Sequence, residues 1–273
     1  MPPFGPLVDL AWLQVHLDDP DVAVVDCRYT LGDPEAGERG FLEGHIPGAA
    51  FLSVSADLSG KVRDGGMDGG RAPIPAPRDF EASARRAGIG TRSKVVAYDE
   101  SGEGGSSRLW WLLRHFGHDS VAVLDGALGA WSEAGGELRS GAEQPPPGNF
   151  SAQERAGDTV GLDDVERGSL RLLDAREPER FRGEQEPMDP VAGHIPGARN
   201  LPSPDIAPDG RFGDEDQLSE QLGEEPFVAY CGSGITATTL LLAAEIAGVE
   251  GRLYPGSWSE WSRRGLPVET GEG

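Results

Sequence analysis

The chain has 273 residues, of which 37% are hydrophobic and 26% charged, and this composition and length are typical of a globular protein with room for two domains. Its 46 acidic residues against 24 Lys and Arg give a formal charge of −22, which disfavours binding to nucleic acid or to an anionic membrane surface. Two cysteines are too few for a disulfide framework or a metal cluster, so we expect no metal or other cofactor. The sequence shows neither a signal-peptide pattern nor an apolar run of the roughly 20 residues that span a membrane. We therefore expect a cytoplasmic protein.

The first half of the chain carries short apolar segments that alternate with turns and helical patterns. VAVVDCR (22–28) is followed by the turn GHIPGA (44–49). VVAYDESG (95–102) precedes the helical pattern SRLWWLLRHFG (107–117), and VLDGALGAW (123–131) ends the series. Short apolar strands that alternate with helices are typical of a parallel sheet covered on both faces.

A proline run then separates the two halves. The prolines of GAEQPPPGNF (141–150) cannot continue a helix, and they predict a stiff, extended spacer. We therefore expect a first domain over 1–141, a linker over 142–154 and a second domain over 155–273.

The second half repeats the segments of the first half in the same order. The repeated segments are LRLLDAR (170–176), GHIPGA (193–198), FVAYCGSG (227–234) and LYPGSWSEW (253–261), and the helical pattern ITATTLLLAAEIAG (235–248) follows the third of them. This duplication predicts two tandem αβα domains, each with a mainly parallel sheet and helices on both faces. Ligands of such open sheets bind beyond the carboxyl ends of the strands.

Cys231 stands at the end of an apolar strand, at the start of the loop CGSGIT. Glycines at alternate positions, Gly232 and Gly234, allow the backbone N–H groups to point inward and form an anion-binding cradle. The helix that follows adds a partial positive charge. Such a cradle favours the thiolate, which is the nucleophilic form of cysteine, and would also stabilise an anionic persulfide. The alternative is that Cys231 is a small buried hydrophobic residue.

The first half has Asp99 at the position of this cysteine. Because a carboxylate cannot accept a sulfur atom as a thiolate does, we expect the first domain to be catalytically inactive. Cys27 has Ala175 as its counterpart, which predicts a structural cysteine. His45 and His194 occupy matching GHIPG turns, and the inactive half keeps its copy, so a structural role is favoured for both.

The first half also contains a longer glycine-rich loop, SGKVRDGGMDGGRAP (59–73), with no equivalent in the second half. Long glycine-rich loops in compact domains are often functional lids. This loop could lie over the site in the second half and deliver Arg71 or Lys61 to an anion. The alternative is a solvated, flexible loop.

These features together resemble tandem-domain rhodanese-type sulfurtransferases. The resemblance rests on the duplicated D-x-R strand ends, both GHIPGA segments, the cysteine loop and the closing GSW-x-E-W (256–261), which are spread over essentially the whole chain. It implies two rhodanese domains with catalysis in the C-terminal one. A small-molecule donor would give its outer sulfur to Cys231, and a thiol or cyanide would take it from the persulfide, with no metal. A thioredoxin-like reductant is a further candidate partner.

Within the family, the loop CGSGIT resembles that of the mercaptopyruvate enzymes, which is a neutral CGSG(V/I)T. The thiosulfate enzymes instead have an Arg and a Lys just after the cysteine. The match implies that Ser233 polarises the donor or relays a proton and that Arg180 binds the donor's carboxylate, which suits the bidentate geometry of a guanidinium. The substrate-binding residues expected in the loop are Gly232, Gly234, Ile235 and Thr236.

The chain departs from this branch at three positions. Ser55 and Ala72 stand where an Asp and a His would complete a relay with the loop serine, and Met188 stands where a second substrate-binding arginine is expected. These departures leave the donor open between 3-mercaptopyruvate and thiosulfate, and they leave a non-catalytic persulfide carrier as an alternative function. A cysteine-dependent phosphatase or arsenate reductase is disfavoured, because Ala237 occupies the position of the arginine in the C-x5-R motif.

Overall fold

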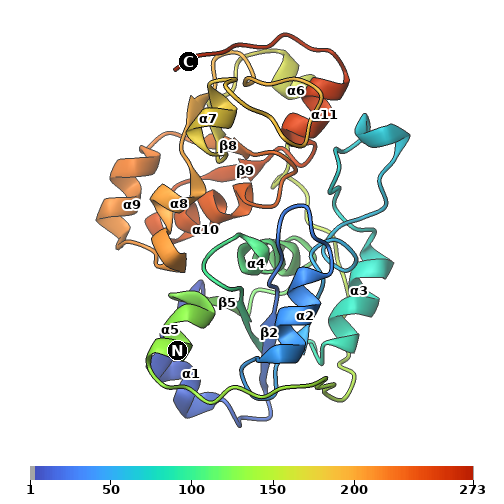
Figure 1. Cartoon of the computed structure of the whole chain (residues 1–273), viewed down its shortest axis with the longest axis vertical. Helices are drawn as coiled ribbons and strands as arrows, with labels where there is room; N and C mark the ends of the chain where they lie inside the picture. Colours follow the sequence, from blue (N-terminus) through green and yellow to red (C-terminus); the bar gives the residue numbers. More distant parts are fainter. Residues whose placement is uncertain (1–3, 273) are drawn as a thin grey trace. The chain divides into compact units, whose positions relative to one another are not determined.

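A computed structural model describes residues 4–272 (Figure 1). By their contacts these residues divide into two compact units. Unit 1 contains residues 4–60, 75–155 and 208–212, and unit 2 contains residues 61–74, 156–207 and 213–272. The glycine-rich segment 61–74 therefore packs with unit 2, although it lies within the first half of the sequence. The proline-rich stretch packs with unit 1, where Gly148 N–H donates to the carbonyl of Arg85 at 2.8 Å.

Unit 1 is built on a five-stranded parallel sheet. The strands are β1 (Leu7–Val8), β2 (Val22–Asp26), β3 (Ala50–Phe51), β4 (Lys94–Tyr98) and β5 (Val121–Leu124), in the order β1-β5-β4-β2-β3. Five α-helices accompany them: α1 (Leu10–His16), α2 (Ala36–Glu43), α3 (Pro77–Arg86), α4 (Gly105–His115) and α5 (Ala127–Glu133).

The two faces of this sheet bury different helices. On one face Val24 and its register partner Val96 share a core with Leu13 of α1, Phe41 of α2 and Trp131 of α5. Side chains alternate along a strand, so Val95 and Ala97 point to the other face. Helix α4 packs on β4 and β5 and is buried along nearly its whole length. Apolar strands buried on both faces are the pattern that the sequence predicts.

Unit 2 repeats this arrangement with a four-stranded parallel sheet. Its strands are β6 (Leu172–Asp174), β7 (Arg199–Asn200), β8 (Phe227–Tyr230) and β9 (Gly251–Leu253), in the order β7-β6-β8-β9. Its α-helices are α6 (Leu162–Glu166), α7 (Pro178–Phe181), α8 (Ser203–Ile206), α9 (Glu215–Leu222), α10 (Ala237–Ala247) and α11 (Ser257–Arg263). In Figure 1, α6, α7 and α11 lie on one side of β8 and β9, and α8, α9 and α10 lie on the other. The predicted fold of two αβα domains is confirmed.

Each sheet is tied to its GHIPG turn by a buried ion pair. Asp174 at the end of β6 accepts from the backbone N–H of Arg176 at 3.0 Å and from its Nη2 at 2.6 Å, and the same Nη2 donates to the carbonyl of Gly193 at 2.7 Å. In unit 1, Arg28 bonds Asp26 and the carbonyl of Gly44 in the same way. The repeated D-x-R and GHIPG motifs are therefore two parts of one connection.

Both GHIPG histidines also have matching surroundings. The His45 ring stacks on Phe41 with 3.9 Å between centroids, and its Nδ1 lies 2.7 Å from the carbonyl oxygen of Phe41. The His194 ring stacks on Phe181 at 3.7 Å, with Nδ1 2.8 Å from the carbonyl oxygen of that residue. The identical setting in both units supports a structural role for the two histidines.

In residues 4–272 no helix combines the length and the apolar character needed to cross a bilayer.

Removing the carboxylate of Asp174 is expected to destabilise the protein strongly. The Asp174→Ala variant leaves the Arg176 guanidinium buried without its main partner, which costs about 3 kcal/mol or more of unfolding free energy. Asp164→Ala is the matched control, because Asp164 pairs with Arg167 on the surface and such a pair contributes about 1 kcal/mol or less. Urea denaturation measures both. Equal losses of unfolding free energy in the two variants would contradict the stabilising role assigned to the buried Asp174–Arg176 pair.

Candidate active site

The loop after β8 directs a backbone N–H group at the sulfur of Cys231. Cys231 is buried, and Gly234 N–H donates to its Sγ at 3.1 Å. Gly234 has a φ of +80°, and a side-chain carbon there would lie 2.7 Å from the carbonyl oxygen of Pro255, so only glycine fits. Helix α10 begins three residues later, at Ala237. One of the inward-pointing N–H groups that the predicted anion cradle requires is therefore in place.

The start of α11 holds the other side of this loop. Cys231 N–H donates to Ser257 Oγ at 3.2 Å, and the same hydroxyl donates to the carbonyl of Tyr254 at 3.0 Å. Trp258 N–H bonds the carbonyl of Cys231, and Ser259 N–H bonds that of Gly232, both at 3.0 Å. The backbone of Cys231 is therefore fixed by a second element, which lies further along the chain than β8.

Ser257 is a residue that the sequence analysis did not identify. Its φ of +52° is in the left-handed region, which is costly for a residue other than glycine and is found at functional sites. Its counterpart in the repeat is Ala127, whose φ is +54°. The backbone strain is therefore common to both units, and the hydroxyl that bonds Cys231 is specific to unit 2. Comparing the two repeats position by position could have found it.

The other predicted site residues lie in the cysteine loop or beside it. Ser233 and Ile235 are buried and Thr236 is half-buried at the start of α10. Arg180, from α7, is buried as well, and it forms a bidentate pair with Glu186, with Nη2–Oε1 at 2.7 Å and Nε–Oε2 at 3.2 Å. A side-chain carbon on Gly232 would lie 3.2 Å from Nη2 of Arg180. The structure thus brings Arg180 next to the cysteine loop.

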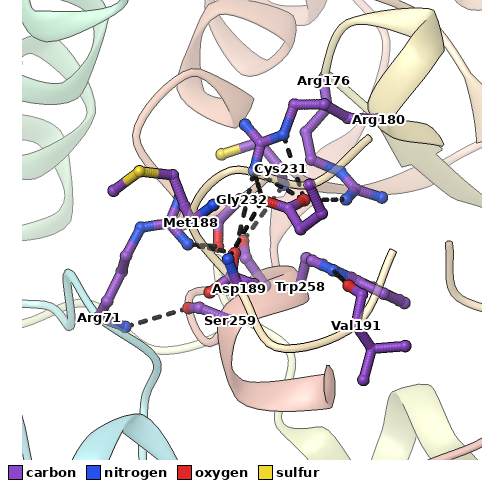
Figure 2. A network of polar contacts seen from close by, with 12 residues as sticks. Arg71, Arg176, Arg180, Met188, Asp189, Val191, Cys231, Gly232, Trp258 and Ser259 are labelled. Atoms are coloured by element: carbon purple, nitrogen blue, oxygen red, sulfur yellow. Dashed lines mark hydrogen bonds and ion pairs between the residues drawn. The ribbon is translucent and has the colours of Figure 1, made fainter. Parts of the chain in front are cut away.

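A second guanidinium, that of Arg71, reaches the same loop (Figure 2). Arg71 Nη1 donates to the carbonyl of Gly232 at 3.1 Å and to the carboxylate of Asp189. Asp189 also accepts from Arg263 of α11, and its side chain is fully buried. Of the two basic residues singled out in the glycine-rich loop, Arg71 therefore meets the cysteine loop, while Lys61 is exposed.

Arginines gather at the site in a strongly acidic protein. Its ion-pair network contains four arginines and three buried carboxylates, namely Arg71, Arg176, Arg180 and Arg263 with Asp174, Glu186 and Asp189. The exposed carboxylate of Glu177 also lies 3.8 Å from Arg180 Nη1, so the network as a whole is neutral, whereas the whole chain carries −22. The negative charge of the chain is thus offset at this place, which lowers the electrostatic cost of binding an anionic ligand there.

The three positions that depart from the mercaptopyruvate branch lie in different surroundings. Met188 N–H donates to Glu186 Oε1 at 3.0 Å, and Met188 and Asp189 line a cavity of about 560 Å³. Ala72 is buried next to Arg71 in sequence. Ser55 belongs to unit 1, where its hydroxyl lies 3.1 Å from that of Ser53. Within residues 4–272, no group of three or more His, Cys, Asp and Glu side chains could hold a metal ion.

The loop after β4 in unit 1 forms the same kind of cradle around a carboxylate. Asp99 is buried and accepts from the backbone N–H groups of Gly102 at 2.9 Å, Gly104 at 3.2 Å and Ser106 at 3.1 Å. Burial, together with the nearby charge of Glu103, raises the pKa of Asp99 to about 6, although hydrogen bonds from Ser106 act against this. The carboxylate thus occupies the place that the sulfur takes in unit 2.

Cys27, the other cysteine, is fully buried at the end of β2. Burial, and to a lesser extent the nearby charge of Asp26, raises the pKa of the Cys27 thiol well above its ordinary value. A thiol that stays protonated is a poor nucleophile, which agrees with a structural cysteine.

The raised pKa of Asp99 predicts a pH-dependent stability. The folded protein holds this proton up to about pH 6, whereas the unfolded chain releases it near the ordinary pKa of 3.8. The contribution of Asp99 to stability is therefore fully present below pH 3.8 and is lost as the pH rises through 6, by about 2–3 kcal/mol. Urea midpoints of the wild type and of Asp99→Asn, compared between pH 4 and 8, isolate this group. A difference in urea midpoint between the two proteins that does not change with pH would refute the raised pKa of Asp99.

Comparisons with known proteins agree with this architecture. The model of the family described as "Rhodanese-like domain" matches residues 9–134 and 161–264. The chain is 43% identical over 277 residues to a protein of Pseudomonas aeruginosa named a probable 3-mercaptopyruvate sulfurtransferase, covering 95% of this chain and 96% of that protein. It is 40% identical over 262 residues to SseB of Mycobacterium tuberculosis, named as a candidate thiosulfate sulfurtransferase, covering 91% of this chain and 90% of that protein. The crystal structure of the 3-mercaptopyruvate sulfurtransferase SseA from Escherichia coli is similar to the structure of this chain, with a TM-score of 0.80 and 31% sequence identity. The match covers 93% of this chain and 99% of that chain.

Proposed function

The chain belongs to the rhodanese family and is a sulfurtransferase, and we propose that it transfers sulfur through a persulfide on Cys231. The observation that supports this most directly is the hydrogen bond from Gly234 N–H to the sulfur, at 3.1 Å, in a buried loop closed by a helix N-terminus. A donor hydrogen bond of this kind stabilises an anionic sulfur, both in the thiolate and in the persulfide.

In the first step, the Cys231 thiolate attacks the outer sulfur of the donor and a sulfur–sulfur bond forms. With 3-mercaptopyruvate, the carbon–sulfur bond breaks, its electron pair stays on carbon, and the thiol proton moves to that carbon to give pyruvate. With thiosulfate, the sulfur–sulfur bond breaks and its electron pair leaves with sulfite. In the second step, a thiol or cyanide attacks the outer sulfur, and the electron pair of the breaking bond returns to Cys231.

We assign the other predicted residues to the donor. Arg180 would bind the carboxylate of the donor, because its guanidinium faces Gly232 beside the nucleophile. Ser233 would polarise the donor or relay the proton, and the backbone of Gly232, Gly234, Ile235 and Thr236 would hold the transferred sulfur. Unit 1 would have no catalytic role, since its cradle already holds the Asp99 carboxylate.

The donor that we favour is 3-mercaptopyruvate, with thiosulfate as the second candidate. No Lys or Arg occurs among the residues that follow Cys231 in the loop, so the loop itself offers no side-chain charge to a dianion. Both donors are named among the relatives. A cytoplasmic location and a thioredoxin-like reductant as acceptor fit this chemistry and are part of the proposal.

Mass spectrometry after incubation with each donor tests the persulfide. We expect the wild type to gain the mass of one sulfur atom on the peptide that contains Cys231, and the Cys231→Ser variant to gain none. Sulfur on the peptide of Cys27 would contradict the assignment of the nucleophile, and sulfur on neither peptide would contradict the proposed function.

A comparison of kcat/KM for the two donors, with cyanide as the common acceptor, tests the donor preference. We expect the value for 3-mercaptopyruvate to exceed that for thiosulfate by about tenfold or more, because the cysteine loop offers no side-chain charge to a dianion. A higher value for thiosulfate would reverse the assignment of the donor and leave the persulfide chemistry in place.

A further inference from the structure

The segment 61–74 is held on unit 2 by contacts that leave little freedom around Arg71. Gly69 N–H donates to Glu260 Oε1 at 3.0 Å, and Arg71 N–H donates to Ser259 Oγ at 3.0 Å. Gly70 has a φ of +75°, and a side-chain carbon there would clash with the carbonyl oxygen of Gly256. The segment therefore rests directly on α11, the helix whose first turn also holds the backbone of Cys231.

The Arg71 guanidinium is anchored through one of its nitrogens. Nη1 donates to the carboxylate of Asp189 and, at 3.1 Å, to the carbonyl of Gly232. Nε and Nη2 of Arg71 make no side-chain hydrogen bond to any of the residues 4–272. The group thus has a fixed position and keeps N–H donors for a ligand. Its side chain is 19% exposed, so a ligand from solvent can reach it.

Arg71 and Arg180 converge on the same point. A side-chain carbon on Gly232 would lie 2.5 Å from Nη2 of Arg71 and 3.2 Å from Nη2 of Arg180. Both guanidinium groups are therefore adjacent to the residue that follows the nucleophile (Figure 2). Each guanidinium is held by a buried carboxylate, Asp189 for Arg71 and Glu186 for Arg180, and an anion at this point would receive N–H donors from Arg71. Arg180 is 3.9 Å from Asp189, the carboxylate that anchors Arg71.

We propose that Arg71 is a donor-binding residue: together with Arg180 it binds the anionic end of the sulfur donor and orients its outer sulfur toward Cys231. This proposal rests on the proposed function and extends it to a residue from the first half of the sequence. Arg71 supplies a second guanidinium at a site where Met188 provides none. The donors selected in this way carry an anionic group close to the transferred sulfur, as 3-mercaptopyruvate and thiosulfate do.

A matched pair of alkylating reagents tests the proposal without sulfur transfer. Bromopyruvate and bromoacetone share a bromomethyl ketone, and only bromopyruvate carries a carboxylate. In both reactions the Cys231 thiolate attacks the bromomethyl carbon, a sulfur–carbon bond forms and bromide leaves. The rate of labelling at Cys231, measured by mass spectrometry with each reagent, gives a selectivity for the anionic reagent over the neutral one.

In Arg71→Gln we expect this selectivity to fall by about tenfold or more, with the bromoacetone rate unchanged, because a charge-assisted hydrogen bond to the carboxylate is lost. Arg71→Lys keeps the charge and should lose less. Arg63→Gln is the control: it removes an equal charge from the same segment, where Arg63 pairs with Asp68 on the surface, and it should leave the selectivity at the wild-type value.

Two outcomes would overturn the proposal. Unchanged selectivity in Arg71→Gln would show that the anion is recognised without Arg71. An equal fall in both rates would show that Arg71 only supports the loop through the carbonyl of Gly232. Failure of the proposed function is distinguishable from either, because it would appear as a wild-type Cys231 that reacts with the reagents and yet never gains sulfur from a donor.

Discussion

The site depends on how the backbone turns between β8 and α10. The turn places Gly234 in a left-handed conformation, and this conformation directs its N–H to the sulfur of Cys231 at 3.1 Å. Without this N–H group, a buried thiol at a strand end bears the full free-energy cost of desolvating its charged form. At Cys27 this desolvation raises the pKa of the thiol. The first turn of α11 then fixes the other side of the loop through Ser257 and Trp258. The reactivity proposed for the cysteine is thus a property of the backbone around it.

The duplication separates what belongs to the fold from what belongs to the chemistry. Both units keep the strand-end ion pair, the stacked histidine and the left-handed residue at the start of the last helix. They differ in what the cradle holds, which is the carboxylate of Asp99 in unit 1 and the sulfur of Cys231 in unit 2. A common frame with two different occupants would allow one half to lack the proposed persulfide chemistry and still keep its motifs.

The sequence was sufficient to predict the fold and to single out the glycine turn after Cys231, because both depend on local patterns. Apolar strands, the glycines of CGSG and the duplicated motifs are each readable within a few residues. The partners of Arg71 were not readable, because Asp189, Gly232 and Ser259 are more than a hundred residues away in the chain. Composition suggested only that the glycine-rich segment could reach an anion, and its packing on α11 depends on tertiary contacts such as that of Gly69 with Glu260. Ser257 was missed because nothing local marks a serine for a left-handed backbone.

A crystal structure of the protein after reaction with its sulfur donor tests the central claim most directly. The account predicts an additional sulfur atom on Sγ of Cys231 that lies inside the loop and accepts hydrogen bonds from the backbone N–H groups of residues 233–236. An additional sulfur that points away from the loop, or one that is bound to Cys27, would contradict the claim that this backbone cradle carries the transferred sulfur.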